Sequence, residues 1–207
     1  MIKLVITDFS GVCSFNEESA YVRDFAKKHN LDGDEFELEY TKFVQQAERD
    51  EFDAPELWQK LAQKYQIKID AKKEIDAMMA TKEYYFNVLD YFDSLRKNYK
   101  VTMYSNYCKT YYQKITDQID LSKYFDLVLF SFMVKARKTE PDGFEFILKK
   151  FNIKPEEAVF IDDSAKNLTV PQKMGIKTIL FEDLEKLKKE LKSIGITSTD
   201  LPTDIHR

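Results

Sequence analysis

Residues 2–12 read IKLVITDFSGV, and this stretch decides the fold. Residues 2–7 form an almost continuous apolar run, which is typical of a parallel strand buried on both faces of a sheet. The run breaks at Asp8, so a carboxylate stands at the carboxyl end of the strand, where open α/β sheets hold their ligands. Two positions later lies Ser10, where a second carboxylate would be most useful for catalysis. The stretch therefore predicts a functional site with one unusual member.

Four more short apolar runs follow along the chain, at residues 101–104, 127–130, 158–161 and 177–180. Each run, like the first, is followed by a polar break and a helical pattern. Strands that alternate with helices form right-handed crossovers. The pattern predicts an α/β protein with a Rossmann-like, mainly parallel sheet and helices on both faces.

The longest gap between these runs holds residues 15–85, which show helical periodicity and no strand-like run. Three amphipathic sets carry this periodicity: Tyr21, Phe25 and Ala26; Phe36, Tyr40, Phe43 and Val44; and Leu57, Trp58, Leu61 and Tyr65. We therefore expect a helical cap domain at residues 15–85, inserted into a core domain of residues 1–14 and 86–207. The insertion leaves the sheet just after Asp8, so it should stand over the strand ends like a lid. Residues 182–194 predict a surface helix and residues 198–207 a loose tail.

Charge and composition limit the classes of partner. The chain has 36 acidic and 32 basic residues, which argues against nucleic-acid binding because that needs a clustered basic surface. No stretch reaches the roughly 20 apolar residues of a membrane span, so we expect no membrane partner and a soluble, cytoplasmic protein. The two cysteines are too few for a disulfide framework, and the two histidines lie far from any acidic cluster. We therefore expect no zinc site.

Polar side chains that suit phosphoryl transfer stand at or after the ends of four runs: Asp8, Ser105 with Asn106, Lys138, and Asp162 with Asp163. The carboxyl ends of parallel strands converge, so these residues should share one pocket. Three acids without histidine or cysteine make an oxygen-only site suited to Mg²⁺. A lysine and a hydroxyl would balance and orient a phosphoryl group. Asp8 would attack phosphorus to form an aspartyl-phosphate, which water then cleaves.

The four segments DFSGV (8–12), YSN (104–106), RKTEP (137–141) and FIDDSAKN (160–167) resemble the four motifs of the haloacid dehalogenase-like (HAD) hydrolase superfamily. Helical residues between the first and second motifs occupy the place of this superfamily's type-1 cap. The chain looks most like the branch that contains the phosphatase domain of soluble epoxide hydrolase and bacterial glucose-1-phosphatases. The resemblance runs through residues 2–181, which is nearly the whole chain.

This resemblance implies a role for each motif residue. Asp8 would be the nucleophile and a metal ligand, and Ser10 would give its backbone carbonyl to Mg²⁺. Ser105 and the amide of Asn106 would hold the phosphate. Lys138 would neutralise Asp8 and the phosphoryl oxygens.

The fourth motif would complete the metal site. The resemblance implies that Asp163 is the direct metal ligand and that Asp162 acts through water or from behind it. Asn167 would steady the loop that carries both acids.

Ser10 departs from the superfamily, whose general acid–base aspartate belongs at this position. Positioned acid–base catalysis contributes roughly 10²- to 10⁴-fold, so its loss should slow both leaving-group protonation and water attack. Relatives in the same branch often carry glycine there, so phosphatase activity remains compatible with the change. Phosphate esters with good leaving groups should be affected least, because the departing oxygen needs less protonation.

Three functions compete on these grounds. The first is a Mg²⁺-dependent phosphatase of a small phosphorylated metabolite, weakened or specialised by Ser10. The alternative is a pseudoenzyme that keeps the fold and metal pocket to bind a ligand or partner protein. The third is a metal-independent haloacid dehalogenase, which would share the Ser-Asn pair of the second motif; such enzymes usually carry tyrosine in place of Ser10 and lack the Asp-Asp pair. No pattern indicates a particular substrate or oligomeric state.

Overall fold

A parallel sheet forms the centre of the computed structural model, which describes residues 1–15 and 17–198. Within these residues the sheet has five strands in the order β5-β4-β1-β6-β7, and every neighbouring pair is parallel. The strands are β1 (Leu4–Thr7), β4 (Lys100–Ser105), β5 (Leu127–Phe130), β6 (Ala158–Asp162) and β7 (Lys177–Leu180). All five were predicted, and the α/β, Rossmann-like class is confirmed. Strands β4 and β6 extend one residue further than predicted, so that Ser105 and Asp162 are their last residues.

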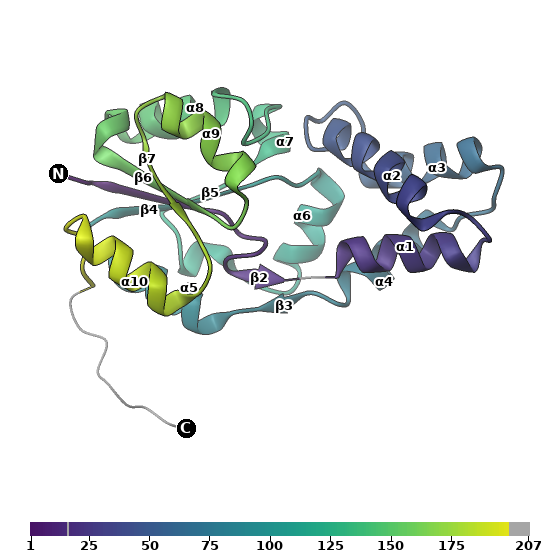
Figure 1. The fold of residues 1–207 in the computed structure, drawn as a ribbon, viewed down its shortest axis with the longest axis horizontal. Coiled ribbons are helices and arrows are strands. Elements are labelled where there is room, and N and C mark those ends of the chain that lie inside the picture. Colours follow the sequence, from purple (N-terminus) through teal and green to yellow (C-terminus); the bar gives the residue numbers. More distant parts are fainter. Residues whose placement is uncertain (16, 199–207) are drawn as a thin grey trace, which may run out of the picture.

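Helices cover both faces of the sheet (Figure 1). On one face lie α5 (Phe86–Leu95), α6 (Lys109–Thr116) and α10 (Leu184–Ser193); on the other lie α8 (Asp142–Phe151) and α9 (Ala165–Lys173). Side chains alternate along β1, since Val5 packs in the apolar cluster of the first face and Leu4 and Ile6 in that of the second. The predicted surface helix is α10, which buries Leu187 and Leu191. Short helical turns α7 (Ser131–Val134), η1 (Leu121–Lys123) and η2 (Pro155–Glu157) occupy the connections.

A helical insertion, residues 17–82, lies at one end of the sheet and contains α1 (Glu18–Lys28), α2 (Gly33–Ala47), α3 (Ala54–Tyr65) and α4 (Ala71–Met79). The three predicted amphipathic sets fall on α1, α2 and α3, whereas α4 was not predicted. Aromatic side chains fill its interior, and the Phe25 and Trp58 rings meet edge to face at 5.2 Å. Asp32, Asp53 and Asp70 accept hydrogen bonds from first-turn amides of α2, α3 and α4, which explains where those helices begin.

The prediction that residues 15–85 contain no strand is wrong at both ends of that range. Strand β2 (Ser14–Phe15) pairs antiparallel with β3 (Glu83–Tyr84), with Ser14 opposite Tyr84. The Tyr85 amide then donates to the Cys13 carbonyl at 2.9 Å. Two-residue strands are too short to produce an alternating pattern, which is why the sequence did not reveal them. The chain thus leaves and rejoins the core through one small ribbon (Figure 1).

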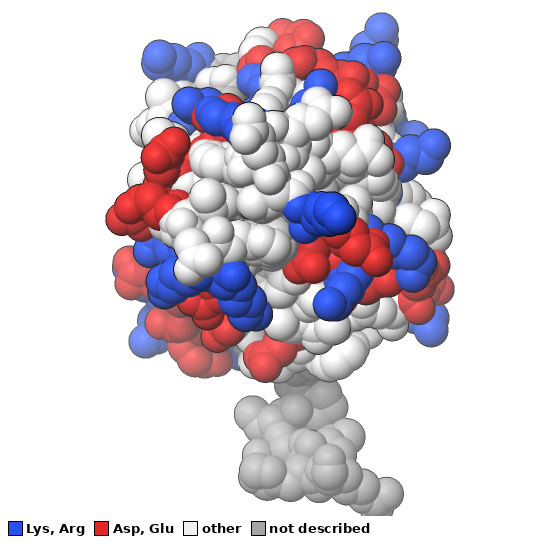
Figure 2. All heavy atoms as spheres, turned by 90° about the vertical axis from the view of Figure 1, so that its right-hand side faces the viewer, with Lys and Arg blue, Asp and Glu red and all other residues white. Residues whose placement is uncertain are grey.

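The surface at the insertion end carries charges of both signs. In Figure 2, acidic and basic side chains are interspersed around an uncharged area, and the face shown has no continuous basic surface. None of the helices in the described ranges is long and apolar enough to cross a membrane. Cys13 and Cys108 are both buried free thiols. The predicted tail, apart from Ser198, lies outside the described residues.

Candidate active site

The strand order brings the predicted polar residues to one edge of the sheet. Strand β1 lies between β4 and β6, and Thr7 is in register with Met103 on one side and Ile161 on the other. Asp8 therefore stands between the ends of two neighbouring strands, which carry Ser105 and Asp162. Lys138 reaches the same point from the loop after α7, and the side chains of Asp8, Ser105, Lys138 and Asp162 are all buried.

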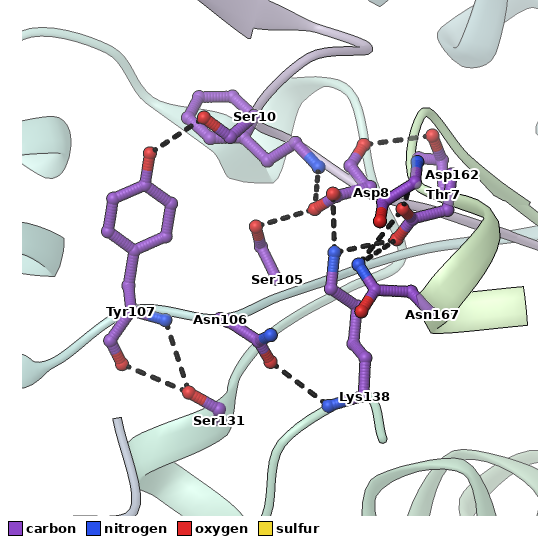
Figure 3. A network of polar contacts seen from close by, with 12 residues as sticks. Thr7, Asp8, Ser10, Ser105, Asn106, Tyr107, Ser131, Lys138, Asp162 and Asn167 are labelled. Atoms are coloured by element: carbon purple, nitrogen blue, oxygen red, sulfur yellow. Dashed lines mark hydrogen bonds and ion pairs between the residues drawn. The ribbon is translucent and has the colours of Figure 1, made fainter. Parts of the chain in front are cut away.

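The carboxylate of Asp8 is held by contacts to both of its oxygens (Figure 3). The Ser105 hydroxyl and the Phe9 amide each donate to Oδ1 at 2.6 Å. Lys138 forms an ion pair with Oδ2 and also donates to Asp162 Oδ2 at 2.7 Å. The structure thus places a hydroxyl and an ammonium in direct contact with one positioned carboxylate.

The electrostatics of this cluster favour a bound cation. Burial alone would lower the pKa of Lys138, but Asp8 and Asp162 more than offset this effect and raise it. Burial, and then the Asp8 charge, raise the pKa of Asp162 to about 7. The same two causes raise the pKa of Asp163. For both acids, burial first and the Asp8 charge second disfavour the charged form, and a bound cation would offset both effects.

The acids also lie close enough to share one ion. Asp8, Asp162 and Asp163 each offer a carboxylate oxygen, and these atoms lie within 4.8 Å of one another. Asp162 already accepts hydrogen bonds from the Ser164 amide at 2.8 Å and from Asn167 Nδ2 at 3.0 and 3.1 Å. Asp163 is exposed and lines the pocket. This all-oxygen set fits a hard cation such as Mg²⁺, with Asp163 facing the pocket and Asp162 behind it.

Gly11 makes room for Asp163, a role that sequence reasoning missed. Its φ is +82°, and a Cβ built on it would lie 2.1 Å from Asp163 Oδ2. Any side chain here would collide with the carboxylate and would also strain the backbone. The glycine in the segment DFSGV (8–12) is the sequence feature that could have indicated this role.

The loop after β4 is fixed to the loop that carries Lys138. The side chain of Asn106 accepts a hydrogen bond from the Lys138 backbone amide at 3.0 Å, and Ser131 Oγ accepts one from the Tyr107 amide at 3.1 Å (Figure 3). The Asn106 side chain thus orients Lys138. The first contact joins the second motif to the third, and the second joins the loop after β4 to α7.

Two further residues contact the site from the side of Ser10, and the sequence did not single them out. Tyr107 donates a hydrogen bond to Ser10 Oγ at 3.2 Å, as Figure 3 shows. Lys82, just before β3, donates to the Tyr107 hydroxyl at 2.8 Å. Lys82 is distant in sequence from all four motifs, so only tertiary structure could place it here.

A pocket of about 580 Å³ opens above these residues. The core contributes Asp8, Ser10, Ser105, Lys138 and Asp163 to its lining, and the insertion contributes Glu17, Glu18, Ser19, Ala20, Val44 and Glu48. Two ion pairs join the end of α2 to the loop of Lys138: Glu48 with Arg137 at 2.5 Å, and Arg49 with Glu140 at 3.0 Å. The insertion therefore forms part of the pocket lining and is joined by ion pairs to the loop that carries Lys138.

Comparisons with known proteins agree with this geometry. D-ribitol-5-phosphate phosphatase of Bacteroides thetaiotaomicron is 26% identical over 205 residues, which cover 94% of this chain and 98% of that protein. Bifunctional epoxide hydrolase 2 of Rattus norvegicus is 37% identical over 83 residues, 40% of this chain but only 15% of the rat protein.

A solved structure shows the same fold. A HAD family enzyme from Bacteroides thetaiotaomicron, in complex with magnesium and inorganic phosphate, superposes with a TM-score of 0.75 at 22% identity, over 90% of this chain and 99% of that one. The profile of the haloacid dehalogenase-like hydrolase family matches residues 2–175, which confirms the resemblance inferred from the motifs. The chain belongs to the haloacid dehalogenase-like hydrolase family.

Proposed function

We propose that this protein is a Mg²⁺-dependent phosphatase that acts on a small phosphorylated metabolite. The observation that carries the proposal is the buried contact of Asp8 with Ser105 and Lys138, beside the exposed carboxylate of Asp163. The similarity to a D-ribitol-5-phosphate phosphatase supports the same reaction class. A pocket of about 580 Å³ also suits a small metabolite.

The metal would be held by Asp8, Asp163 and the backbone carbonyl of Ser10, with Asp162 behind them. When bound, Mg²⁺ would offset the charge of the phosphoryl oxygens and of the clustered acids. Lys138 stays protonated between two carboxylates, so it adds a fixed positive charge beside Asp8. Asn167 keeps Asp162 in place through its two hydrogen bonds.

The reaction would proceed in two displacements at phosphorus. Asp8 attacks, the bond between phosphorus and the leaving oxygen breaks, and an aspartyl-phosphate forms on the carboxylate. Water then attacks the same phosphorus and restores Asp8. Ser105, Lys138 and the amide of Asn106 orient the phosphoryl group in both steps.

Residues 15–85 would act as a cap domain on the core domain of residues 1–14 and 86–207. The insertion supplies one wall of the pocket, including Glu18 and Glu48, so it would contact the leaving group rather than the phosphate. Closure of such a segment excludes water from the reaction. Substrate choice would therefore depend on the insertion, and phosphoryl transfer on the strand ends.

Phosphate release from p-nitrophenyl phosphate and a panel of phosphorylated metabolites tests the proposal. The wild-type protein should release phosphate with Mg²⁺ and lose this activity in EDTA. Asp8→Asn should lose at least about 10³-fold, because an amide is no nucleophile. The matched control Asp34→Asn changes an exposed acid of α2 and should match wild type. Equal activity of Asp8→Asn and wild type would refute the assignment of Asp8.

The pseudoenzyme alternative is motivated by Ser10, which stands where an acid is expected. It requires that wild-type protein and Asp8→Asn are equally inactive across the panel, while calorimetry still detects Mg²⁺ or phosphate binding. The acid pair Asp162–Asp163 argues against the metal-independent dehalogenase. Halide release from 2-haloacids in excess EDTA would reverse that conclusion.

A further inference from the structure

A directed chain of hydrogen bonds runs from a buried lysine to Ser10. Lys82 Nζ lies 2.8 Å from the Tyr107 hydroxyl, which lies 3.2 Å from Ser10 Oγ. An ammonium group has only donors, so Tyr107 accepts from Lys82 and turns its own hydrogen toward Ser10. Ser10 Oγ therefore accepts from Tyr107, and its hydrogen is available to an oxygen atom in the pocket, which both Ser10 and Tyr107 line.

The surroundings of Lys82 are unusual for a lysine. It is buried, and its Nζ lies 5.2 Å from the centre of the Phe9 ring and 5.3 Å from that of Tyr107. Among the ion pairs of residues 1–15 and 17–198, none includes Lys82. The charged groups that face it are Glu18 on α1 and Asp8 after β1, and both act at a distance. Burying a lysine without a contacting carboxylate costs free energy of folding. A functional role would account for this placement.

We propose that Lys82, acting through Tyr107, supplies and takes back the proton at Ser10 during phosphoryl transfer, in place of the missing aspartate. This inference rests on the proposed phosphatase function. Lys82 touches neither substrate nor metal, so it is a positioning residue, and Ser10 is the group that meets the leaving oxygen.

The proton movements balance over the cycle. As the phosphorus–oxygen bond breaks, the Ser10 hydroxyl gives its proton to the leaving oxygen. Tyr107 gives its hydroxyl proton to Ser10, and Lys82 gives an ammonium proton to Tyr107. Lys82 is then a neutral amine. When water attacks the aspartyl-phosphate, its proton passes to Ser10 and back along the same chain. The sum is a phosphate ester and water converted to an alcohol and phosphate, with Lys82 again an ammonium.

The acidity of Lys82 suits this task. Burial lowers its pKa to about 8, while Glu18 and Asp8 act in the opposite direction. A general acid works best when its pKa lies near the working pH, and an ordinary lysine at about 10.4 would hold its proton too tightly. The Tyr107 hydroxyl accepts from Lys82 and donates to Ser10, so it can pass a proton between them.

The leaving-group dependence of kcat tests the inference. Lys82→Met, Lys82→Arg and Tyr107→Phe should lose about 10- to 100-fold in kcat on an alkyl phosphate, but less than about threefold on p-nitrophenyl phosphate, whose leaving group needs no proton. Arginine keeps the charge but does not release its proton. The control Lys188→Met removes a lysine that lies over the Tyr91 ring and should lose nothing. Equal losses on both substrates would overturn the inference.

Ser10→Asp provides a second test that a purely structural role would not pass. A carboxyl group at position 10 can itself give up and take back the proton, so Lys82→Met in this background should cost less than about threefold on the alkyl phosphate. A full loss in the double variant would mean that Lys82 does not act through position 10.

A third measurement needs no turnover. In Mg²⁺-free protein labelled with [¹³C]lysine, the Lys82 signal, assigned by its absence in Lys82→Met, should titrate near pH 8. Titration with the surface lysines near 10.4 would contradict the inference. If wild-type protein releases phosphate from no substrate, the proposed function and this inference fail together. If the wild-type protein is active but each Lys82 variant loses as much on p-nitrophenyl phosphate as on the alkyl phosphate, the inference fails alone.

Discussion

Two buried lysines lie near the loop that follows β1, and their surroundings differ. Lys138 is 2% exposed and contacts the carboxylates of Asp8 and Asp162, which raise its pKa. Lys82 is 7% exposed and contacts two aromatic rings and a hydroxyl, and burial lowers its pKa to about 8. Lysine is therefore a fixed charge at Lys138 and a more readily deprotonated group at Lys82. Contact with a carboxylate decides whether the pKa of the buried lysine is raised or lowered.

Lys138→Met should produce the largest effect of this comparison. Removing one partner of a buried ion pair costs about 3–5 kcal/mol, because Asp8 and Asp162 keep their charges without compensation. We also expect kcat to fall by at least about 10³-fold, since the phosphoryl oxygens lose a direct cationic partner. Urea unfolding without Mg²⁺ and phosphate release with it measure the two effects. A variant that keeps a tenth of wild-type activity would show that Lys138 is not the essential charge.

Lys82→Met should change the pH dependence of stability. Because the pKa of Lys82 is lower in the folded than in the unfolded protein, the unfolded state binds more protons between about pH 8 and 10.4. The free energy of unfolding of wild type should therefore rise with pH in this window, by about 2 kcal/mol relative to Lys82→Met. Urea titrations at pH 7.5 and 10 measure the difference between the two proteins, which cancels their shared titrations. A constant difference would contradict the depressed pKa.

Glu18→Gln should have the smallest effect. Glu18 is the charge on α1 that opposes the burial of Lys82, so its neutralisation should lower the pKa of Lys82 by up to about one unit. The ¹³C signal of Lys82 reports this change directly. Glu18→Gln should leave Lys138 unaffected, because Asp8 and Asp162 govern that lysine. An unchanged pKa of Lys82 would mean that Glu18 does not act on it.

The two lysines also show what sequence reasoning reaches. Lys138 was predicted because it precedes Thr139-Glu140-Pro141, a local pattern with a fixed place after a strand. The five strands were predicted for a related reason, since a strand buried on both faces is a contiguous apolar run. Such features are local, and one stretch of chain contains the whole signal. The roles assigned to Asp8, Ser105, Asp163 and Asn167 remain predictions, although the structure brings these residues together.

Lys82 was not predicted because its surroundings come from three distant segments. Phe9 precedes Ser10, Tyr107 follows β4, and Lys82 stands before a two-residue strand that shows no periodicity. Its own neighbours in sequence, Thr81 and Glu83, are ordinary surface residue types. A contact of this kind depends on how the insertion returns to the core, and no single segment encodes that.

The β2–β3 ribbon has a consequence for recombination. Paired residues of an antiparallel ladder have Cα atoms about 4.5–5.5 Å apart, so the insertion begins and ends at neighbouring points, with Ser14 opposite Tyr84. A foreign helical segment whose two ends lie equally close could replace residues 17–81 without altering the strand order of the sheet. Such a chimera would retain Lys82 and every strand-end residue while acquiring a different pocket wall. The ribbon is therefore a suitable junction for exchanging this wall of the pocket between relatives.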